Sequence, residues 1–356
     1  HMKSLILFLL LFVPIFSIQA SEELPAIALV QATEQGQGVL FKYRDDCYAV
    51  IPTHVLANDI FASLHGSSKK AGMGDADLIE SFGYDLSLMY LSGSLSKSCQ
   101  YRYNRHIDLN RLLSESAHAT ISTVNEDQTV SRRNVRVDDT GLLYLRVTPT
   151  REMDQLYKGL SGSLVTIEGQ AVGMLMKVDP ETGAGSVLRF DRIVETLAPY
   201  FSNSQYSNVK ASPEQAQVSS QKLKGFKVTE WSAPATGAAL RAGNLSDSSS
   251  DTLWRAEFTK RPIYIVLQSD KPEVVTSVDI DGTRVNLEAE LPKDIEILSS
   301  SSDDGGWNAV KTITFLKNKK HATVMLAPIR AKRIMLRIYS NWGSSEAVSL
   351  NQLTIQ

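Results

Sequence analysis

Three chemically reactive residues stand at points in the first half of the chain where the local pattern changes from strand to turn. His54 follows the apolar run 47–51, Asp85 opens the alternating run 85–91, and Ser161 lies in the turn Gly-Leu-Ser-Gly. Short alternating runs bounded by polar turns are typical of β strands. The chain therefore needs an all-β fold that brings distant strand ends to one place.

The three residues form a constellation suited to nucleophilic catalysis, in the order base, acid, nucleophile. A serine hydroxyl is a weak nucleophile, so His54 would take the proton of Ser161 while Asp85 orients the imidazole. The backbone N–H groups of Gly159 and Ser161 are candidates for an oxyanion hole, because glycine allows the turn that aims both inward. Each motif alone occurs by chance in many proteins, so the prediction depends on their conjunction.

The motifs resemble those of the chymotrypsin-like serine proteases. Thr53-His54 is similar to the family's histidine loop, the run 85–91 to its Asp-Ile-Ala-Leu-Leu strand, and 159–164 to the Gly-Asn-Ser-Gly-Gly-Ala-Leu of bacterial periplasmic members. The resemblance implies an all-β, two-barrel fold and a serine endopeptidase acting on protein or peptide substrates. It also implies that the Asp85 carboxylate is buried beneath the imidazole.

Two positions depart from the family pattern. Leu160 stands where trypsin-like zymogens carry the aspartate that receives a freed N-terminus, so activation by that ion pair is not expected. Ser163 replaces a second glycine of the nucleophile motif, which is a mild change in the oxyanion loop.

The substrate-binding residues are predicted by position relative to Ser161. Counting back six residues reaches Gln155, with Leu156 beside it, so no carboxylate is available for a lysine or arginine side chain. The predicted wall strand 174–178 includes Met176 and Val178, and its methionines suit a medium apolar side chain. The alternative is that the methionines only fill the core.

The N-terminus predicts export. His1-Met2 looks like a tag remnant, and residues 1–20 read as a signal peptide with an apolar centre and a terminal alanine. We therefore expect a secreted or periplasmic protein, with a retained membrane anchor as the alternative. Two cysteines in an oxidising compartment predict a Cys47–Cys99 disulfide, the alternative being two buried free thiols. A net charge of −2 argues against nucleic acid as a partner.

The chain is predicted to contain two domains. Residues 24–201 form the protease-like domain and end in a helix over 191–197, and the Ser- and Gln-rich segment 202–222 is a linker. Residues 223–356 again read as all-β. Their expected strands are 263–267, 274–280, 294–298 and 333–339.

The second domain resembles the discoidin domains of coagulation-factor-5/8 type C, a galactose-binding-like family. The similarity lies in 242–254, 301–307 and 331–337. It implies a jelly-roll β sandwich that binds a glycan, a membrane lipid or a protein surface through its loops. Trp342 is the aromatic candidate for stacking on a sugar, whereas Trp254 is expected in the core.

The discoidin resemblance also implies that a calcium site could be present in the second domain. Asp247 is followed by serine rather than glycine, and Asn351-Gln352 stand where a glutamate is usual. We therefore predict no cofactor and no metal among the site residues, with calcium in the second domain as the alternative.

Three functions are compatible with these features. The favoured one is an exported serine endopeptidase whose second domain docks it on a glycan, surface or protein partner. The alternative is a catalytically inactive protease-fold protein that acts through its discoidin-like domain. An esterase using the same triad is a third reading, disfavoured because the strand and loop contexts match proteases.

Overall fold

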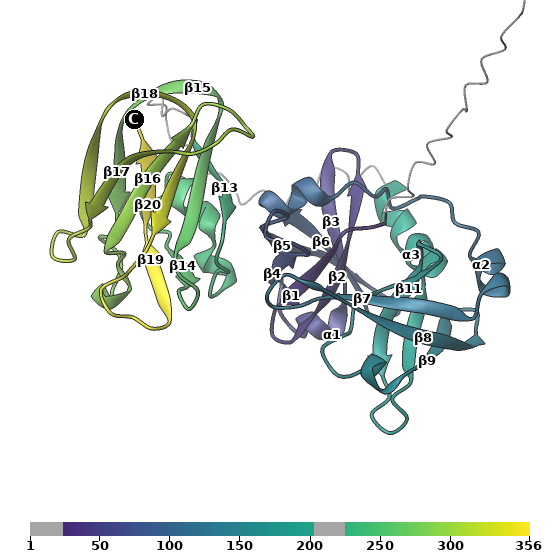
Figure 1. Cartoon of the computed structure of the whole chain (residues 1–356). Coiled ribbons are helices and arrows are strands. Elements are labelled where there is room, and N and C mark those ends of the chain that lie inside the picture. The colour runs from purple at the N-terminus through teal and green to yellow at the C-terminus, as the bar shows by residue number, and fades with distance from the viewer. Residues whose placement is uncertain (1–23, 203–224) are drawn as a thin grey trace, which may run out of the picture.

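The computed structural model describes residues 24–202 and 225–356. The predicted signal peptide and all but Ser202 of the predicted linker lie outside these residues. The described chain is all-β, as predicted: two closed six-stranded barrels are followed by a β sandwich (Figure 1).

The first barrel closes in the order β1-β2-β3-β6-β5-β4. The register pairs Pro52, the last residue of β3, with Leu86, the first residue of β6. The end of β3 that leads to His54 therefore lies beside the start of β6 that follows Asp85. The strands are β1 (Ile27–Gln31), β2 (Gln35–Tyr43), β3 (Asp46–Pro52), β4 (Phe61–Gly66), β5 (Met73–Phe82) and β6 (Leu86–Ser92), with the helical turns α1 (Thr53–Leu56) and η1 (Ser94–Ser98).

The second barrel closes in the order β10-β11-β12-β9-β8-β7. Glu168 and Gly169 have φ angles of 49° and 75° and make the tight turn that follows the nucleophile motif. The strands are β7 (His118–Val124), β8 (Val130–Thr140), β9 (Tyr144–Pro149), β10 (Leu164–Ile167), β11 (Gln170–Val178) and β12 (Gly185–Arg189), with α2 (Leu109–Glu115) before them and η2 (Glu152–Asp154) between β9 and β10.

Helix α3 (Phe190–Ser202) packs against both barrels. Its Phe201 ring lies 4.5 Å from the Tyr43 ring and 5.2 Å from the Tyr48 ring, and the Tyr43 hydroxyl donates to the Phe201 carbonyl at 2.6 Å. The helix thus joins the two barrels through a shared cluster of packed aromatic and aliphatic side chains. Within the described ranges, no helix has the length and apolar character needed to cross a membrane.

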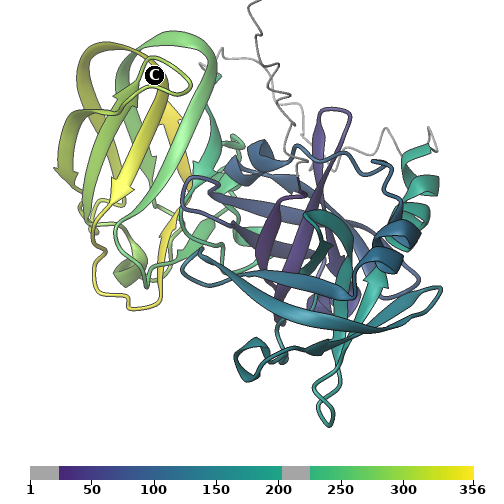
Figure 2. The ribbon, with the colours of Figure 1, turned by 45° about the vertical axis from the view of Figure 1, so that its right-hand side comes forward.

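The sandwich contains one sheet in the order β13-β15-β18-β16-β17, with β20 on β15, and a two-stranded sheet of β14 and β19 (Figure 2). Trp254 is 1% exposed in its core, as predicted. The elements are β13 (Lys227–Trp231), η4 (Ala238–Leu240), η5 (Ala242–Ser246), β14 (Trp254–Glu257), β15 (Ile263–Asp281), η6 (Glu288–Glu290), β16 (Asp294–Ser300), β17 (Asn308–Thr314), β18 (His321–Ile338), β19 (Ala347–Leu350) and β20 (Gln352–Ile355).

The expected strands 263–267 and 274–280 are one continuous strand, β15. Its register with β18 shifts between Gln268 and Glu273, and Pro272 lies within that irregularity. Proline lacks the N–H that a regular ladder needs, so it is tolerated at a bulge. The sequence pattern therefore marks an interruption of the ladder, not the end of a strand.

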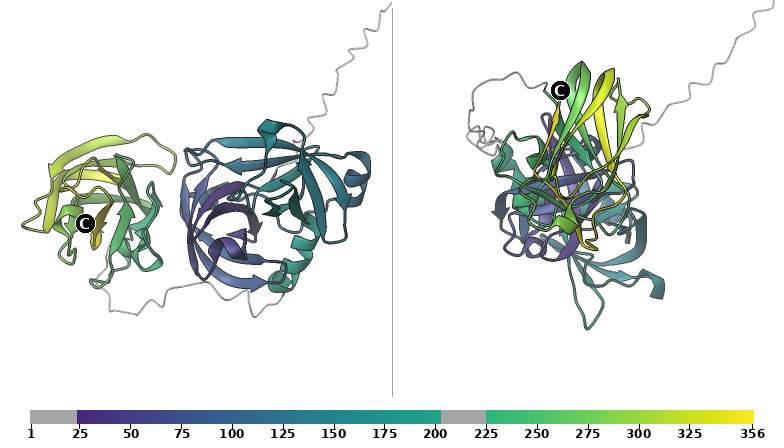
Figure 3. Two further views of the ribbon diagram at one scale, coloured as in Figure 1. Left: turned by 90° about the horizontal axis from the view of Figure 1, so that it is seen from below. Right: turned by 90° about the vertical axis from the view of Figure 1, so that its left-hand side faces the viewer.

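The sandwich lies beside the first barrel and contacts it (Figure 3). Arg241 of the sandwich donates to both carboxylate oxygens of Asp77 in β5, at 2.7 and 2.8 Å. Met73 of the same strand belongs to the sandwich core cluster, which also contains Trp231. The contact surface is therefore close-packed and includes a bidentate ion pair.

Candidate active site

The one-turn helix α1 carries His54 directly after β3. Pro52 has φ −61° and ψ 131°, so the extended chain continues up to the first helical residue. The Thr53 N–H donates to the carbonyl oxygen of Asp85 at 2.8 Å, and the Thr53 hydroxyl lies 2.9 Å from that of Ser87. These contacts hold α1 against the turn that precedes β6.

The Asp85 carboxylate contacts His54 at two points. The His54 backbone N–H donates to Oδ1 at 3.0 Å, and the imidazole Nδ1 lies 2.5 Å from Oδ2. Because Nδ1 is held by a carboxylate, Nε2 is the ring nitrogen left to exchange a proton. The pair therefore has the geometry of a base and its orienting acid.

The expectation that Asp85 is buried is wrong. The side chains of His54 and Asp85 are 42% and 41% exposed. Strand β6 begins at Leu86, and Asp85 lies in the preceding turn, where Tyr84 and Asp85 have φ angles of 63° and 61°. Two successive left-handed residues carry the chain out of the strand ladder, so the carboxylate reaches α1 from the rim of the barrel.

The turn that carries Ser161 depends on two glycines in the left-handed region. Gly159 has φ 100° and Gly162 has φ 92°. A Cβ on Gly162 would overlap the carbonyl oxygen of Gln37 in β2. The Gly162 N–H donates to the Leu175 carbonyl at 2.6 Å, while the Ser161 carbonyl accepts from the Gln37 N–H at 2.8 Å. Both barrels therefore fix the nucleophile turn.

The three predicted catalytic residues line one cleft of about 790 Å³ between the barrels. No hydrogen bond joins His54 to Ser161 within the part of the chain that the structure describes. Catalytic hydrogen bonds are often long until a substrate binds. In the same described residues the N–H groups of Gly159 and Ser161 have no acceptor, so both are available to an oxyanion.

Three of the four predicted substrate-binding residues line this cleft: Leu156, Met176 and Val178. Gln155 is exposed and does not line it. Gln155 directly follows η2 and its side chain is exposed, whereas the next residue, Leu156, is 7% exposed and faces the cleft. Met174 is 1% exposed and therefore fills the core, which is the alternative role of the methionines.

Three tyrosines that sequence reasoning missed also line the cleft. Tyr84, Tyr144 and Tyr157 are 45%, 36% and 53% exposed. Burial raises the pKa of Tyr144, and the negative charge of Asp85 adds to this effect. Tyr84 and Tyr157 flank the predicted motifs, but Tyr144 comes from a separate hairpin that no local signal connects to the site.

The predicted disulfide between Cys47 and Cys99 is confirmed. It links β3, which leads to His54, to the end of η1, which follows β6. The covalent bond therefore ties β3 to the segment that follows β6, at the ends of these strands that lie away from the His54–Asp85 pair.

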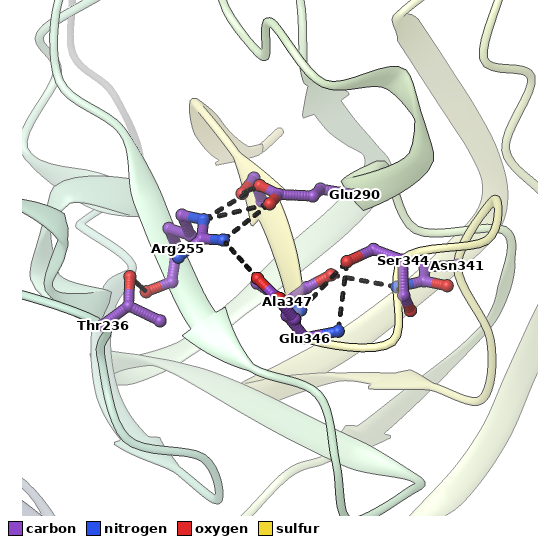
Figure 4. A network of polar contacts seen from close by, with 8 residues as sticks. Thr236, Arg255, Glu290, Asn341, Ser344, Glu346 and Ala347 are labelled. Carbon is purple, nitrogen blue, oxygen red and sulfur yellow. Dashed lines mark hydrogen bonds and ion pairs between the residues drawn. The ribbon is translucent and has the colours of Figure 1, made fainter.

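A polar network occupies one end of the sandwich (Figure 4). Arg255 Nε and Nη2 donate to the Glu290 carboxylate at 2.7 to 3.1 Å, and the Ser349 hydroxyl donates to it at 2.7 Å. Burial opposes ionisation of Glu290, but these donors hold its pKa below the usual value. Glu346, 82% exposed, lies 3.9 Å from Arg255 and extends the network to solvent.

Trp342 lies near this network but is half-buried. Its indole N–H donates to the Phe315 carbonyl at 2.9 Å. The ammonium groups of Lys293 and Lys317 lie 5.1 and 5.3 Å from the ring centroid. The ring is therefore engaged in packing and cation–π contacts, and its stacking on a sugar stays a prediction.

At the position of the calcium alternative, Asp247 and Asn351 bond to neighbouring groups of the chain. One Asp247 oxygen accepts from the Ser249 N–H and the Thr252 hydroxyl. The buried Asn351 points an amide N–H at the Thr252 carbonyl, so a donor stands where calcium needs oxygen ligands. In residues 24–202 and 225–356, no group of three His, Cys, Asp or Glu side chains could hold a metal.

No protein-family model matches the sequence, and no curated protein matches it. Solved structures that resemble part of the chain include carbohydrate-binding modules. A chitosan-binding module from a Paenibacillus chitosanase/glucanase is 19% identical over 39% of this chain and 99% of that module, with a TM-score of 0.33. A Clostridium perfringens module in complex with GalNAc-β-1,3-galactose is 16% identical over 36% and 94% of the two chains, with a TM-score of 0.33. A family 32 carbohydrate-binding module from Streptococcus pneumoniae is 19% identical over 38% and 99%, with a TM-score of 0.32.

Proposed function

We propose that the chain is an exported serine endopeptidase with a C-terminal docking domain. The observation that carries the proposal is the two-point hold of the Asp85 carboxylate on His54, in the cleft that Ser161 also lines. An ordinary surface ion pair involves only two charged side chains. Here the Asp85 carboxylate also accepts from the backbone N–H of His54, which fixes the position of the imidazole.

His54 is the proposed general base and acid. Its Nε2 takes the proton of the Ser161 hydroxyl as the oxygen attacks a peptide carbonyl carbon. The bond from that carbon to the leaving amine then breaks, and the acyl group stays on Ser161 as an ester. The same proton then goes to that amine. Asp85 keeps Nδ1 protonated and stabilises the imidazolium that forms between these steps. In the second half, water attacks the ester and the roles repeat.

The nucleophile turn supplies the proposed oxyanion hole. Charge develops on the carbonyl oxygen during attack, and the unpaired N–H groups of Gly159 and Ser161 are fixed donors for it. Neither needs to break another hydrogen bond to do so. Leu156, Met176 and Val178 are proposed to receive a medium apolar side chain on the acyl side, such as leucine.

A fluorophosphonate probe tests the catalytic proposal, because it reacts covalently only with an activated serine. Labelling of the wild-type protein is expected at neutral pH, and Ser161→Ala or His54→Ala should abolish it without unfolding the chain. Ser250→Ala and His106→Ala, which change exposed residues outside the cleft, are the matched controls. A folded wild-type protein that stays unlabelled would refute the endopeptidase.

The alternative is a protease-fold protein without activity that works through its sandwich. The observation favouring it is the exposure of Asp85, because solvent weakens the hold of a carboxylate on an imidazolium. An unlabelled, folded protein that still binds a ligand through the sandwich would support this alternative.

We further propose that the network around Arg255 and Glu290 binds a glycan. Fixed arginine and carboxylate groups at a loop end can bond to neighbouring hydroxyls of a sugar ring. Glu346→Gln removes the exposed carboxylate while sparing the buried ion pair, and it should weaken retention on a glycan array. Glu273→Gln in β15 is the matched control, since it lies outside this network. Equal retention of both variants would exclude the site.

A further inference from the structure

A second hollow, of about 750 Å³, continues from the candidate active-site cleft. It extends along the end of β7 to Asn125 and Glu126. Because five residues line both hollows, the two spaces adjoin beside the nucleophile turn, and the pair is called the groove from here on. The residues common to both linings are Glu34, Gln35, Tyr157, Lys158 and Gly159.

The groove has two chemically different halves on either side of the nucleophile turn. The apolar residues Leu156, Met176 and Val178 line only the first hollow. The second hollow is lined largely by polar groups, among them Gln35 and Asn125. If the acyl half of a substrate occupies the apolar part, its leaving-group half runs into the polar part.

The sandwich reaches the far end of this groove. Lys260, in the loop between β14 and β15, donates from its Nζ to the Glu126 carbonyl at 3.3 Å. The neighbouring Arg261 donates to the Phe258 and Ser344 carbonyls at 3.2 and 3.0 Å, which fixes the loop to the sandwich. A side chain of the second domain therefore stands at the end of the groove of the first.

We propose that the substrate is an extended polypeptide that is recognised on both sides of the scissile bond, and that Lys260 determines specificity on the leaving-group side. The inference rests on the proposed endopeptidase function. An ammonium group carries three N–H donors, so Lys260 can keep its bond to Glu126 and also donate to carbonyl oxygens of a bound chain. The Arg241–Asp77 ion pair holds the sandwich where this contact is made. Lys260 is thus a substrate-binding residue supplied by the second domain.

Internally quenched peptides test the proposal on the full-length protein. The peptides share an acyl half ending in leucine and carry either one residue or about six residues after the scissile bond, six spanning ~20 Å when extended. The wild-type kcat/KM should be higher for the long peptide. Lys260→Ala should lower it by about tenfold or more for the long peptide, as expected for loss of a hydrogen bond from a charged donor, and leave the short peptide unchanged. Lys260→Arg should retain the preference.

Lys271→Ala is the matched control, because Lys271 is an exposed lysine of the same domain whose ion pair is with Glu273 and not with a residue that lines the groove. Absence of a length effect, or equal loss on both peptides, would overturn the inference while fluorophosphonate labelling of Ser161 continued to support the endopeptidase. An unlabelled Ser161 would remove the proposed function and this inference together.

Discussion

Gln37 of the first barrel donates its backbone N–H to the carbonyl oxygen of Ser161 in the second barrel, at 2.8 Å. Its side chain, in a residue that is only 3% exposed, accepts from the Val124 N–H at 2.8 Å and donates to the Val124 carbonyl at 3.0 Å. One glutamine therefore joins a strand of the first barrel to both the nucleophile turn and the end of β7.

Replacing Gln37 tests this junction. In Gln37→Ala the buried N–H and carbonyl of Val124 lose their partners, which should cost about 2 kcal/mol of unfolding free energy. Fluorophosphonate labelling of Ser161 should also slow, because the lost side chain no longer ties β2, whose Gln37 N–H still bonds to the turn, to the end of β7. Urea unfolding and labelling rates measure the two effects. Gln100→Ala, at an exposed position, should change neither, and equal behaviour of the two variants would contradict the assigned role.

Substitution by alanine should have different effects at Gly162, in the nucleophile turn, and at Gly169, in the turn that follows it. Gly162→Ala places a Cβ onto the Gln37 carbonyl oxygen, so the turn must move and labelling should fall by about 10²-fold or more. Gly169 has φ 75° but nothing within 4 Å of an added Cβ, so Gly169→Ala should cost only about 1–2 kcal/mol of stability. Labelling of the Gly169 variant should stay near the wild-type rate, whereas a parallel loss in both would show that φ strain alone controls the site.

The disulfide should contribute substantially to stability. Its closed loop spans a sequence separation of 52, which corresponds to about 4 kcal/mol of lost chain entropy in the unfolded state. The double variant Cys47→Ala/Cys99→Ala should unfold at lower urea by that free energy, and dithiothreitol should reproduce the effect only in the wild-type protein. An unchanged wild-type midpoint in reductant would contradict the prediction.

Asp75 should make stability depend on pH. It is 2% exposed, and burial raises its pKa to about 7, opposed by the Arg241 guanidinium and reinforced by Asp77. One of its carboxylate oxygens has no hydrogen-bond partner among the described residues. Because the folded pKa lies above the unfolded one, folding favours the protonated acid, and this contribution is lost as the pH rises from about 4 to about 7.

The variant Asp75→Asn keeps the shape of the side chain without its ionisation. The difference in unfolding free energy between Asp75→Asn and wild type should therefore be near zero at about pH 4. It should rise to the order of 4 kcal/mol, in favour of the variant, at about pH 8. The contribution of His65 to the pH dependence of stability is the same in both proteins and cancels in the comparison. Its pKa is lowered to about 4 by burial and by Lys260. Urea unfolding across this range measures the difference, with Asp270→Asn as the exposed control. A difference independent of pH would show that Asp75 does not titrate there.

The sequence by itself determined the features that depend on near neighbours. The runs 47–51 and 85–91 predicted strands at the positions of β3 and β6, because a side-chain period of two is a local property. The glycines of 159–162 indicated the turn around Ser161 for the same reason. The cysteine pair was suggested by number and compartment, without any knowledge of distance.

Tertiary structure decided where these pieces meet. The exposure of Asp85 follows from the way its turn meets α1, and the exclusion of Gln155 follows from the direction in which one extended segment crosses the cleft. Nothing in the sequence distinguishes Lys260 from other lysines, yet packing of the sandwich on the first barrel brings it to Glu126, at the far end of the groove between the barrels. Such relationships join residues more than a hundred positions apart. They depend on how closed barrels and a sandwich bury their surfaces against one another, which no local pattern encodes.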